Sequence, residues 1–212
     1  MQSGRTCPTV FQRKRMSKKR EKSQKQGGRY AFTARALCYI AVATALLCVC
    51  AWIALPLGDI PFTLQTLGVF LIGGLLGWKR AILAVTAYLL LGFVGVPVFA
   101  GFTGGAGKIL SPTGGYLVGF LCTGLVCGMA GDLFAEKKGG RATLALGAGM
   151  FLGLLLCYAF GTLWFLLLTA QGQGVSVWTA LTLCVFPYLP LDLVKIFPAV
   201  VLTKKLRLLI KK

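Results

Sequence analysis

Residues 142–168 have the sequence ATLALGAGMFLGLLLCYAFGTLWFLLL, which contains no charged side chain. A helix that crosses the hydrocarbon core of a membrane needs about 20 mostly apolar residues, within a range of about 17–25. This stretch exceeds that length, so it predicts a membrane-spanning helix that tilts or breaks. The composition agrees, because 57% of the 212 residues are hydrophobic and only 13% are charged. These values exclude an ordinary soluble domain for residues 36–203.

Apolar segments of similar character lie on both sides of this stretch. They cover residues 36–55, 60–77, 81–98, 114–134 and 177–203. Together with residues 142–168 they predict an all-α membrane protein, a six-transmembrane-helix bundle. Residues 1–29 are polar and basic. The expected organisation is therefore a disordered basic tail over 1–29, in which Met16 begins a second candidate translation start, and a six-helix membrane domain over 30–212.

The positive charges are concentrated in alternate gaps between the apolar segments. The chain has 23 lysine and arginine residues against five aspartate and glutamate residues, a net charge of +18. All the cations except Lys108 and Lys195 lie before the first segment or after the second, fourth and last segments. By the positive-inside rule, this pattern places both termini in the cytoplasm of a multi-pass protein of the cytoplasmic membrane. We expect the basic tail to be attracted to anionic membrane lipid. RNA binding by the tail is the alternative, although no nucleic-acid partner is expected from the distribution of charge.

Two prolines interrupt the last apolar segment. Pro187 and Pro190 disfavour a continuous helix, because proline lacks a backbone donor and restricts the residue before it. We expect a short segment over 175–186, a break, and a second helix that starts near Pro190. Asp192 then lies in the first turn of this helix, where a carboxylate complements the helix dipole. Broken helices at membrane depth are tolerated mainly where they are buried in protein or line a cavity.

Asp192 and Lys195 are the one clear pair of opposite charges within the apolar segments. Their spacing of three residues places them on one helix face. Lys195 lies nine residues before Lys204, which is about 13 Å of helix, so it belongs inside the bilayer and in its outer half. An ionisable pair at this depth is a candidate functional site. The alternative is an ion pair within one helix that stabilises packing and binds nothing.

Other candidate binding residues lie toward the expected outer face. Gln65 enters the second segment from outside, where its amide either bonds a neighbouring helix or contacts a ligand. Phe99 begins a glycine-rich outer loop whose backbone allows close approach to a ligand. Lys108 is the one cation in the outer gaps. The aromatic residues near this face are either interface-belt residues or walls of an outer pocket, namely Tyr116, Tyr158, Trp164, Phe186 and Tyr188.

The sequence contains no constellation of residues that is typical of an enzyme. It has no histidine, no C-x-x-C pair, no nucleophile elbow and no Walker motif. Seven of the eight cysteines lie in apolar segments, where a thiol acts as a small hydrophobic side chain. We therefore predict no catalytic residues, no metal site and no cofactor, and the chain cannot itself hydrolyse ATP to drive transport.

Four motifs occur in order along the chain. They are IPFTLQT at 60–66, GVPVFAG at 95–101, SPTGGY at 111–116 and PYLPLDLVK at 187–195. Together with the six predicted segments, they closely resemble the BioY family of biotin-specific substrate-binding subunits of energy-coupling-factor (ECF) transporters. The resemblance covers about residues 35–207. The chain departs from it at Leu191, where the family often has glycine, so the local helix start and pocket width are expected to differ.

The resemblance implies high-affinity biotin binding near the outer face and uptake across the cytoplasmic membrane. It also implies a partner module of one transmembrane coupling protein and two cytoplasmic ATPase subunits. Ala41 and Ala45 match the small residues of the first helix that contact the coupling protein, and their spacing allows close helix approach. Biotin is the transported ligand and not a cofactor. The alternatives are a binding subunit for another vitamin and a membrane scaffold whose basic tail recruits a partner.

Biotin offers ureido N–H donors, a ureido carbonyl, an apolar sulfur ring and a carboxylate tail. The Asp and Lys of the family motif, here Asp192 and Lys195, are associated with biotin recognition. We expect Asp192 to bind the ureido end, because a buried carboxylate accepts N–H bonds. Lys195 then either meets a biotin oxygen or orients Asp192. Lys108 is expected to attract the carboxylate tail.

Overall fold

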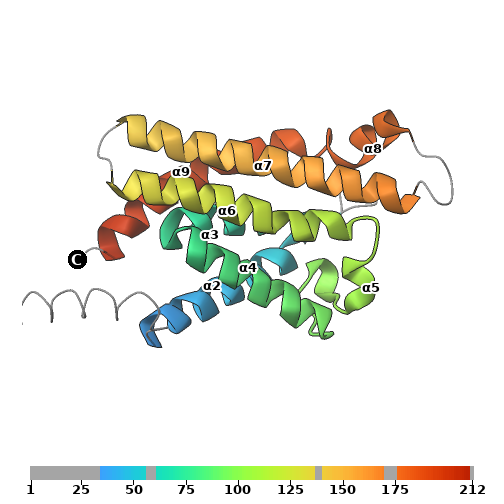
Figure 1. Ribbon diagram of the computed structural model, residues 1–212, viewed down its shortest axis with the longest axis horizontal. Coiled ribbons are helices and arrows are strands. Elements are labelled where there is room, and N and C mark those ends of the chain that lie inside the picture. The colour runs from blue at the N-terminus through green and yellow to red at the C-terminus, as the bar shows by residue number, and fades with distance from the viewer. Residues whose placement is uncertain (1–33, 56–60, 137–139, 170–175, 211–212) are drawn as a thin grey trace, which may run out of the picture. The chain divides into compact units, whose positions relative to one another are not determined.

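The computed structural model describes residues 34–55, 61–136, 140–169 and 176–210, and almost all of them are helical (Figure 1). The basic tail over 1–29, including Met16, lies outside these residues. The chain divides into residues 1–37 and a larger unit, residues 38–212, whose packing is described below. The helices are α2 (Ala34–Trp52), α3 (Gln65–Leu76), α4 (Trp78–Phe93), α5 (Ala106–Ile109), α6 (Gly114–Glu136), α7 (Gly140–Thr169), α8 (Val177–Cys184) and α9 (Leu189–Ile210).

Each of the six predicted apolar segments overlaps one of the longer helices or, for the last segment, the pair α8 and α9. Within the described ranges, three helices are long and apolar enough to cross a membrane, namely α2, α6 and α7. The α8–α9 pair, bent by 49°, is a candidate fourth span. The structure therefore confirms an all-helical membrane protein with three to four candidate spans. Helices α3 and α4 have 12 and 16 residues, about 18 and 24 Å, which is less than the roughly 30 Å of a hydrocarbon core.

The helix α3 is shorter than its predicted segment at both ends. Its N-terminal side is taken by β2 (Phe62–Thr63), which pairs antiparallel with β1 (Ala54–Leu55). Its C-terminal side stops at Gly77, whose positive φ of 77° turns the chain directly into α4. Glycine adopts this backbone conformation without steric cost.

The break in the last segment is confirmed. Helix α8 ends at Cys184 and α9 begins at Leu189, so the two prolines fall in and next to the turn between them. Asp192 lies in the first turn of α9, as expected. The backbone N–H of Asp192 donates to the carbonyl of Tyr188 at 2.9 Å, which fixes the carboxylate at the start of the helix.

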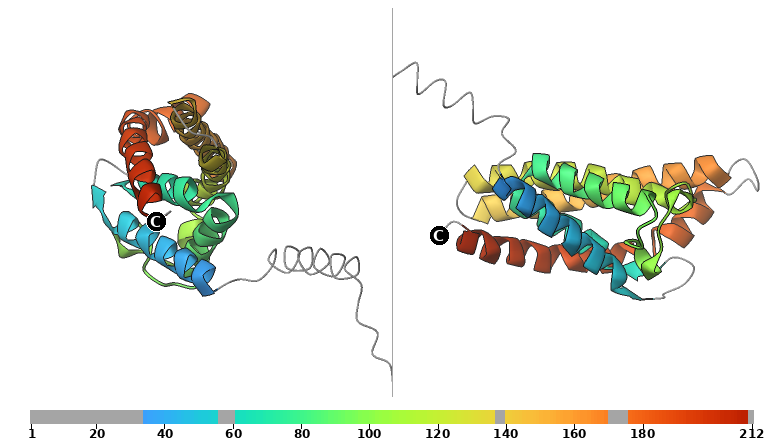
Figure 2. Two further views of the ribbon diagram at one scale, coloured as in Figure 1. Left: turned by 90° about the vertical axis from the view of Figure 1, so that its left-hand side faces the viewer. Right: turned by 90° about the horizontal axis from the view of Figure 1, so that it is seen from below.

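The helices pack around α3 and α6. Helix α6 contacts α3, α4 and α7, and α3 also contacts α9 (Figure 1). Seen end-on, α7 and α9 lie beside each other and α2 lies across the bundle from them (Figure 2). A Cβ at Gly73 of α3 would lie only 2.7 Å from the Cβ of Cys127 on α6, so a small residue allows these helices their close approach.

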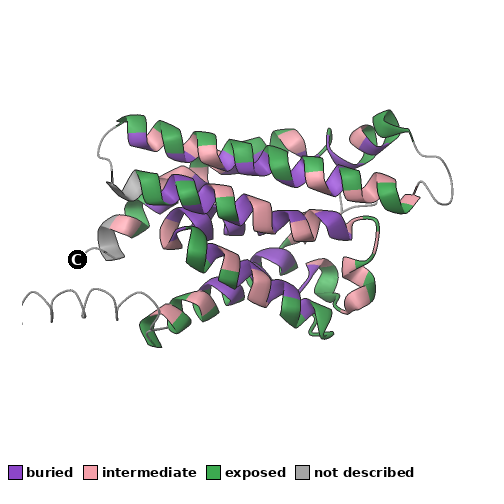
Figure 3. Ribbon diagram, viewed as in Figure 1, coloured by how far each residue is buried: buried purple, intermediate pink, exposed green. Residues whose placement is uncertain are grey.

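Buried residues form two apolar clusters between these helices, and the outward faces remain apolar. One cluster surrounds Tyr88 and Phe99, and the other surrounds Phe70 and Met150. The ribbon is coloured as buried mainly on the inner helix faces in Figure 3. Large apolar residues such as Leu144 and Phe197 are exposed. Apolar outward faces are typical of helices that are solvated by lipid.

The predicted outer linker between α4 and α6 is partly ordered. It contains a 3-10 turn, η1 (Ala100–Phe102), and the short helix α5. Phe99 and Thr103 form a single antiparallel bridge across the turn, and Gly101 turns the chain with a φ of 69°. This arrangement fixes the position of Phe99, and Lys108 follows in the last turn of α5.

Candidate functional site

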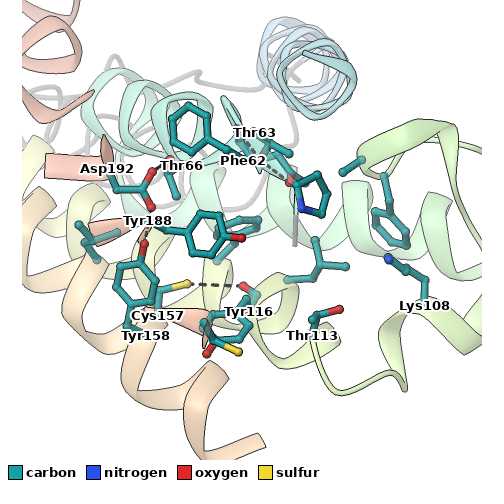
Figure 4. Close-up of a pocket in the computed structure, with 18 residues that line it drawn as sticks. Phe62, Thr63, Thr66, Lys108, Thr113, Tyr116, Cys157, Tyr158, Tyr188 and Asp192 are labelled. Atoms are coloured by element: carbon teal, nitrogen blue, oxygen red, sulfur yellow. Dashed lines mark hydrogen bonds between the residues drawn. The ribbon is translucent and has the colours of Figure 1, made fainter. Parts of the chain in front are cut away.

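A cavity of about 130 Å³ lies between β2, α3, the α4–α6 connection, α6, α7, α8 and α9 (Figure 4). One water molecule needs roughly 10–15 Å³ by the same measure, so the cavity has room for part or all of an organic ligand. Its lining is mostly apolar and aromatic, with one carboxylate and one ammonium group. The lining residues are Pro61, Phe62, Thr63, Gln65, Thr66, Phe99, Ala100, Lys108, Thr113, Tyr116, Leu117, Phe120, Leu154, Cys157, Tyr158, Cys184, Tyr188 and Asp192.

The Asp192 carboxylate is the acidic group of the cavity and is only 5% exposed. Its Oδ1 accepts from the hydroxyl of Thr66 at 2.8 Å and from Nζ of Lys195 at 2.6 Å. Its Oδ2 accepts from the hydroxyl of Tyr158 at 2.7 Å. Donors from α3, α7 and α9 therefore hold this carboxylate. A carboxylate has about four lone-pair sites, so one site remains for a further donor.

Lys195 lies behind Asp192 and is not part of the cavity lining. Its ammonium group donates to Asp192, to the hydroxyl of Thr66 at 2.9 Å and to the carbonyl of Thr63 at 2.5 Å. It also lies 3.8 Å from the centre of the Phe62 ring. An ammonium group has three N–H donors, and all three have acceptors here. Of the two expected roles, this geometry favours orientation of Asp192 over direct contact with a ligand.

Gln65 bonds a neighbouring helix and also lies in the lining of the cavity. Its amide nitrogen donates to the hydroxyl of Tyr88 on α4 at 2.6 Å, and its amide oxygen accepts from the hydroxyl of Thr63 at 2.8 Å. The Tyr88 hydroxyl donates in turn to the carbonyl of Val98 at 3.2 Å. This buried chain of bonds links β2, α3 and α4 beside the cavity, and Gln65 also contributes to its lining.

Glycine residues on neighbouring helices position the aromatic walls. A Cβ at Gly92 would overlap the ring of Phe99, and a Cβ at Gly161 would overlap the ring of Tyr116. Each ring therefore fills the space that a missing side chain leaves. Tyr116 and Tyr158 meet edge to face, with ring centroids 6.1 Å apart. These three predicted aromatic residues all line the cavity.

Trp164, expected as either an interface-belt residue or a pocket wall, is not among the lining residues of the cavity. Its ring packs where Gly115 has no side chain, and its indole N–H donates to the carbonyl of Ser111 at 3.2 Å. It stacks on Phe160 with ring centroids 6.3 Å apart. Trp164 therefore fixes the turn that precedes α6 and supports the cavity from outside.

The two charged lining groups lie on opposite sides of the cavity. Lys108 comes from the last turn of α5, whereas Asp192 comes from the first turn of α9 (Figure 4). Apolar side chains such as Leu117 and Phe120 lie among the lining residues. The site is therefore suited to an elongated molecule that has donors at one end, an apolar middle and an anionic group at the other end.

Several lining residues were not predicted. Phe62 and Thr63 belong to the motif at 60–66, so the motif was a signal that could have identified them. Cys157 and Cys184 had no such signal, because a thiol in an apolar segment is indistinguishable from a core residue. No group of three or more possible metal ligands occurs among the described residues.

Ala41 and Ala45 lie away from the cavity lining. Both are exposed and stand one turn apart on α2. The residues between them include Thr44, whose hydroxyl donates to the carbonyl of Ala84 at 3.1 Å and so fixes the opposite face of α2 against α4. The two alanines are therefore available on the outward face of the helix.

Comparison with known proteins connects this geometry to one family. The family model described as the BioY family matches residues 18–212. The biotin transporter BioY of Thermotoga maritima is 40% identical over 174 residues, which cover 82% of this chain and 96% of the relative. The biotin transporter BioY of Rhodobacter capsulatus is 37% identical over 150 residues, 68% of this chain and 77% of the relative.

A solved structure shows the same fold. The crystal structure of the S-component for biotin from an ECF-type ABC transporter superposes with a TM-score of 0.72 and 27% sequence identity. The match covers 82% of this chain and 90% of the solved chain.

Proposed function

The chain belongs to the BioY family, and from this premise we propose that it binds biotin and takes it up across the cytoplasmic membrane as the substrate-specific subunit of an ECF-type transporter. The relatives named as biotin transporters and the solved biotin S-component support this function. The observation that carries the proposal is the cavity with Asp192 on one side and Lys108 on the other.

The chemistry of biotin matches the order of groups in this cavity. The ureido N–H groups are donors for the remaining lone pair of Asp192. The apolar sulfur ring fits between the aromatic walls that Phe99, Tyr116 and Tyr158 form. The carboxylate tail is placed near Lys108. Gln65 is a further polar group of the lining that can meet the ureido carbonyl.

Lys195 acts in this proposal as a positioning residue. A buried carboxylate without a partner is strongly unfavourable, and the adjacent ammonium group compensates it. Because Lys195 also donates to the Thr63 carbonyl, it holds β2 against α9 at the edge of the cavity. The ion pair thus holds β2 and α9 together at the binding site.

We propose that all six helical segments cross the membrane, with both termini in the cytoplasm. The short helices α3 and α4 cross as part of the bundle, where α6 and α9 cover them. Figure 1 places α5 at the end of the bundle away from the C-terminal end of α9, which carries Lys204 and Lys205. The basic end then faces the cytoplasm and the Lys108 end faces outward.

The proposed partners are a transmembrane coupling protein and two cytoplasmic ATPase subunits, as expected for an ECF-type transporter. The sequence contains no Walker motif, so the energy for transport comes from those partners. The exposed pair Ala41 and Ala45 is the proposed contact with the coupling protein, because small side chains allow helices to approach closely in lipid.

Uptake of radiolabelled biotin tests this function. Cells that lack their own biotin transporter are supplied with the chain and an ECF module, and accumulated label is measured. We expect uptake that excess unlabelled biotin abolishes and that Asp192→Asn strongly reduces. Uptake at the level of cells without the chain, from protein that is folded in the membrane, would overturn the proposal.

A further inference from the structure

A second hollow lies on the outward surface between α7 and α9, away from the biotin cavity. Leu144, Gly147 and Phe151 of α7 contribute to its lining, as do Phe197, Val200 and Lys204 of α9. Gly147 forms part of its floor, because a Cβ there would meet only Val200, at 3.8 Å. This surface is a groove and not a buried core, because Leu144 is 76% exposed and Phe197 is 77% exposed.

The length of the groove matches one leaflet of a membrane. Along α9 its lining runs from Leu193 to Lys204, which is 12 residues and a rise of about 16 Å. The hydrocarbon core of a bilayer is about 30 Å thick, so this distance is close to half of it. One acyl chain of a lipid in a single leaflet spans the same depth.

The charges of the groove lie at one end. Among the described residues of the lining, Lys204 carries the one charged side chain, and it is exposed. Helices α7 and α9 run antiparallel and side by side, so the start of α7, with the exposed Arg141, lies at the same end (Figures 1 and 2). Basic residues at the end of an apolar surface between membrane helices are suited to an anionic lipid headgroup.

We propose that this groove binds one anionic glycerophospholipid of the cytoplasmic leaflet. Its acyl chain lies along Gly147, Val200 and Phe197, and its headgroup phosphate pairs with Lys204. Phosphatidylcholine, a zwitterionic phospholipid, carries a choline cation that is unfavourable at this basic end, so the site distinguishes headgroups by charge. The inference rests on the proposed membrane orientation but not on biotin binding.

Native mass spectrometry of the detergent-purified chain tests the proposal. The chain is titrated with dioleoylphosphatidylglycerol and, separately, with dioleoylphosphatidylcholine, which has the same acyl chains. We expect one phosphatidylglycerol to bind more tightly than phosphatidylcholine. Lys204→Gln is expected to weaken phosphatidylglycerol binding about fivefold, the factor that one lysine near an anionic surface contributes. The matched control Lys205→Gln, a neighbouring exposed cation outside the lining, is expected to retain it.

A groove-filling variant separates the apolar part of the site from the charge. Gly147→Leu has room for its first carbon and replaces glycine by a good helix former, so the fold is expected to persist, as thermal unfolding will check. Because its side chain would occupy the groove, Gly147→Leu should abolish binding of both phosphatidylglycerol and phosphatidylcholine. Equal binding of both lipids, or equal losses in Lys204→Gln and Lys205→Gln, would overturn the proposal. A protein dimer that Gly147→Leu dissociates would assign the groove to a second copy and also overturn it.

Discussion

At the scale of single residues, the site depends on how a buried ion pair is compensated. Asp192 is 5% exposed and Lys195 is 6% exposed. Taking two such charges out of water costs several kcal/mol for each ion, and close geometry with further hydrogen bonds is needed to offset this cost. Thr63, Thr66 and Tyr158 provide those bonds. The carboxylate is therefore fixed in place before a ligand arrives.

Asp192→Asn is expected to weaken biotin binding about 10- to 100-fold, which corresponds to the loss of a hydrogen bond to a charged acceptor. It also leaves Lys195 buried without its counter-charge, so the free energy of unfolding should fall by about 3–5 kcal/mol. Calorimetry measures the biotin affinity, and thermal unfolding measures the stability.

The matched control is Asp132→Asn, at an exposed carboxylate near the end of α6 that accepts from the backbone N–H of Trp78. Unchanged biotin affinity in Asp192→Asn would contradict the assigned role.

Lys108→Gln is expected to weaken biotin binding about fivefold, as for a partly solvated ion pair. The same variant should bind biotinamide as well as the unaltered chain does, because this analogue has no anionic tail. Comparison of the two dissociation constants by calorimetry tests which end of biotin lies near Lys108. An equal loss for biotin and biotinamide would show that Lys108 supports the cavity in another way.

Three of the residues that the sequence singled out line the cavity: Asp192 and Gln65, because polar groups are rare in apolar segments, and Lys108, because it is the one cation in the outer gaps. They did not identify the Thr63 carbonyl as a partner of Lys195, because every residue has a backbone carbonyl and only the pairing of β1 with β2 presents this one. The sequence left Trp164 as either a belt residue or a pocket wall for a related reason. Its aromatic character fits a pocket wall, and only the packing against Gly115 shows that it faces elsewhere.

At the scale of elements, close packing at glycines determines the shape of the cavity. Gly161→Ala would place a methyl group where the Tyr116 ring lies, so we expect weaker biotin binding and a loss of about 1–3 kcal/mol in the free energy of unfolding. Gly147→Ala on the same helix is the matched control, because its methyl group meets only Val200 at an ordinary distance. If both variants lower the unfolding midpoint and the biotin affinity equally, packing of Tyr116 is not the cause.

The apolar segments predicted where helices occur better than where they end. The break between α8 and α9 was predictable, because Pro187 and Pro190 act through local backbone geometry. The shortness of α3 was not, since Phe62 and Thr63 are apolar enough to extend the segment but pair with β1 instead. The order within the loop before α6 depends on contacts such as the Phe99–Thr103 bridge, which hydropathy does not encode.

At the scale of the whole molecule, binding and assembly are expected to use separate surfaces. The cavity lies between helices, whereas Ala41 and Ala45 lie on the outward face of α2. Ala45→Trp should therefore prevent copurification with the coupling protein and leave biotin affinity within about twofold, since about 0.5 kcal/mol is typical of surface changes. Leu163→Trp, at a 56% exposed position of α7, is the control. Retained assembly in Ala45→Trp, or its equal loss in Leu163→Trp, would contradict this division.

Calorimetric titration of biotin into the detergent-purified chain, with thiamine and riboflavin as controls, tests the central claim most directly. Biotin supplies both the ureido donors and the anionic tail that Asp192 and Lys108 require, so we predict one-to-one binding of biotin and none of the other two vitamins. Absence of biotin binding by folded protein, or equal binding of thiamine or riboflavin, would contradict the account.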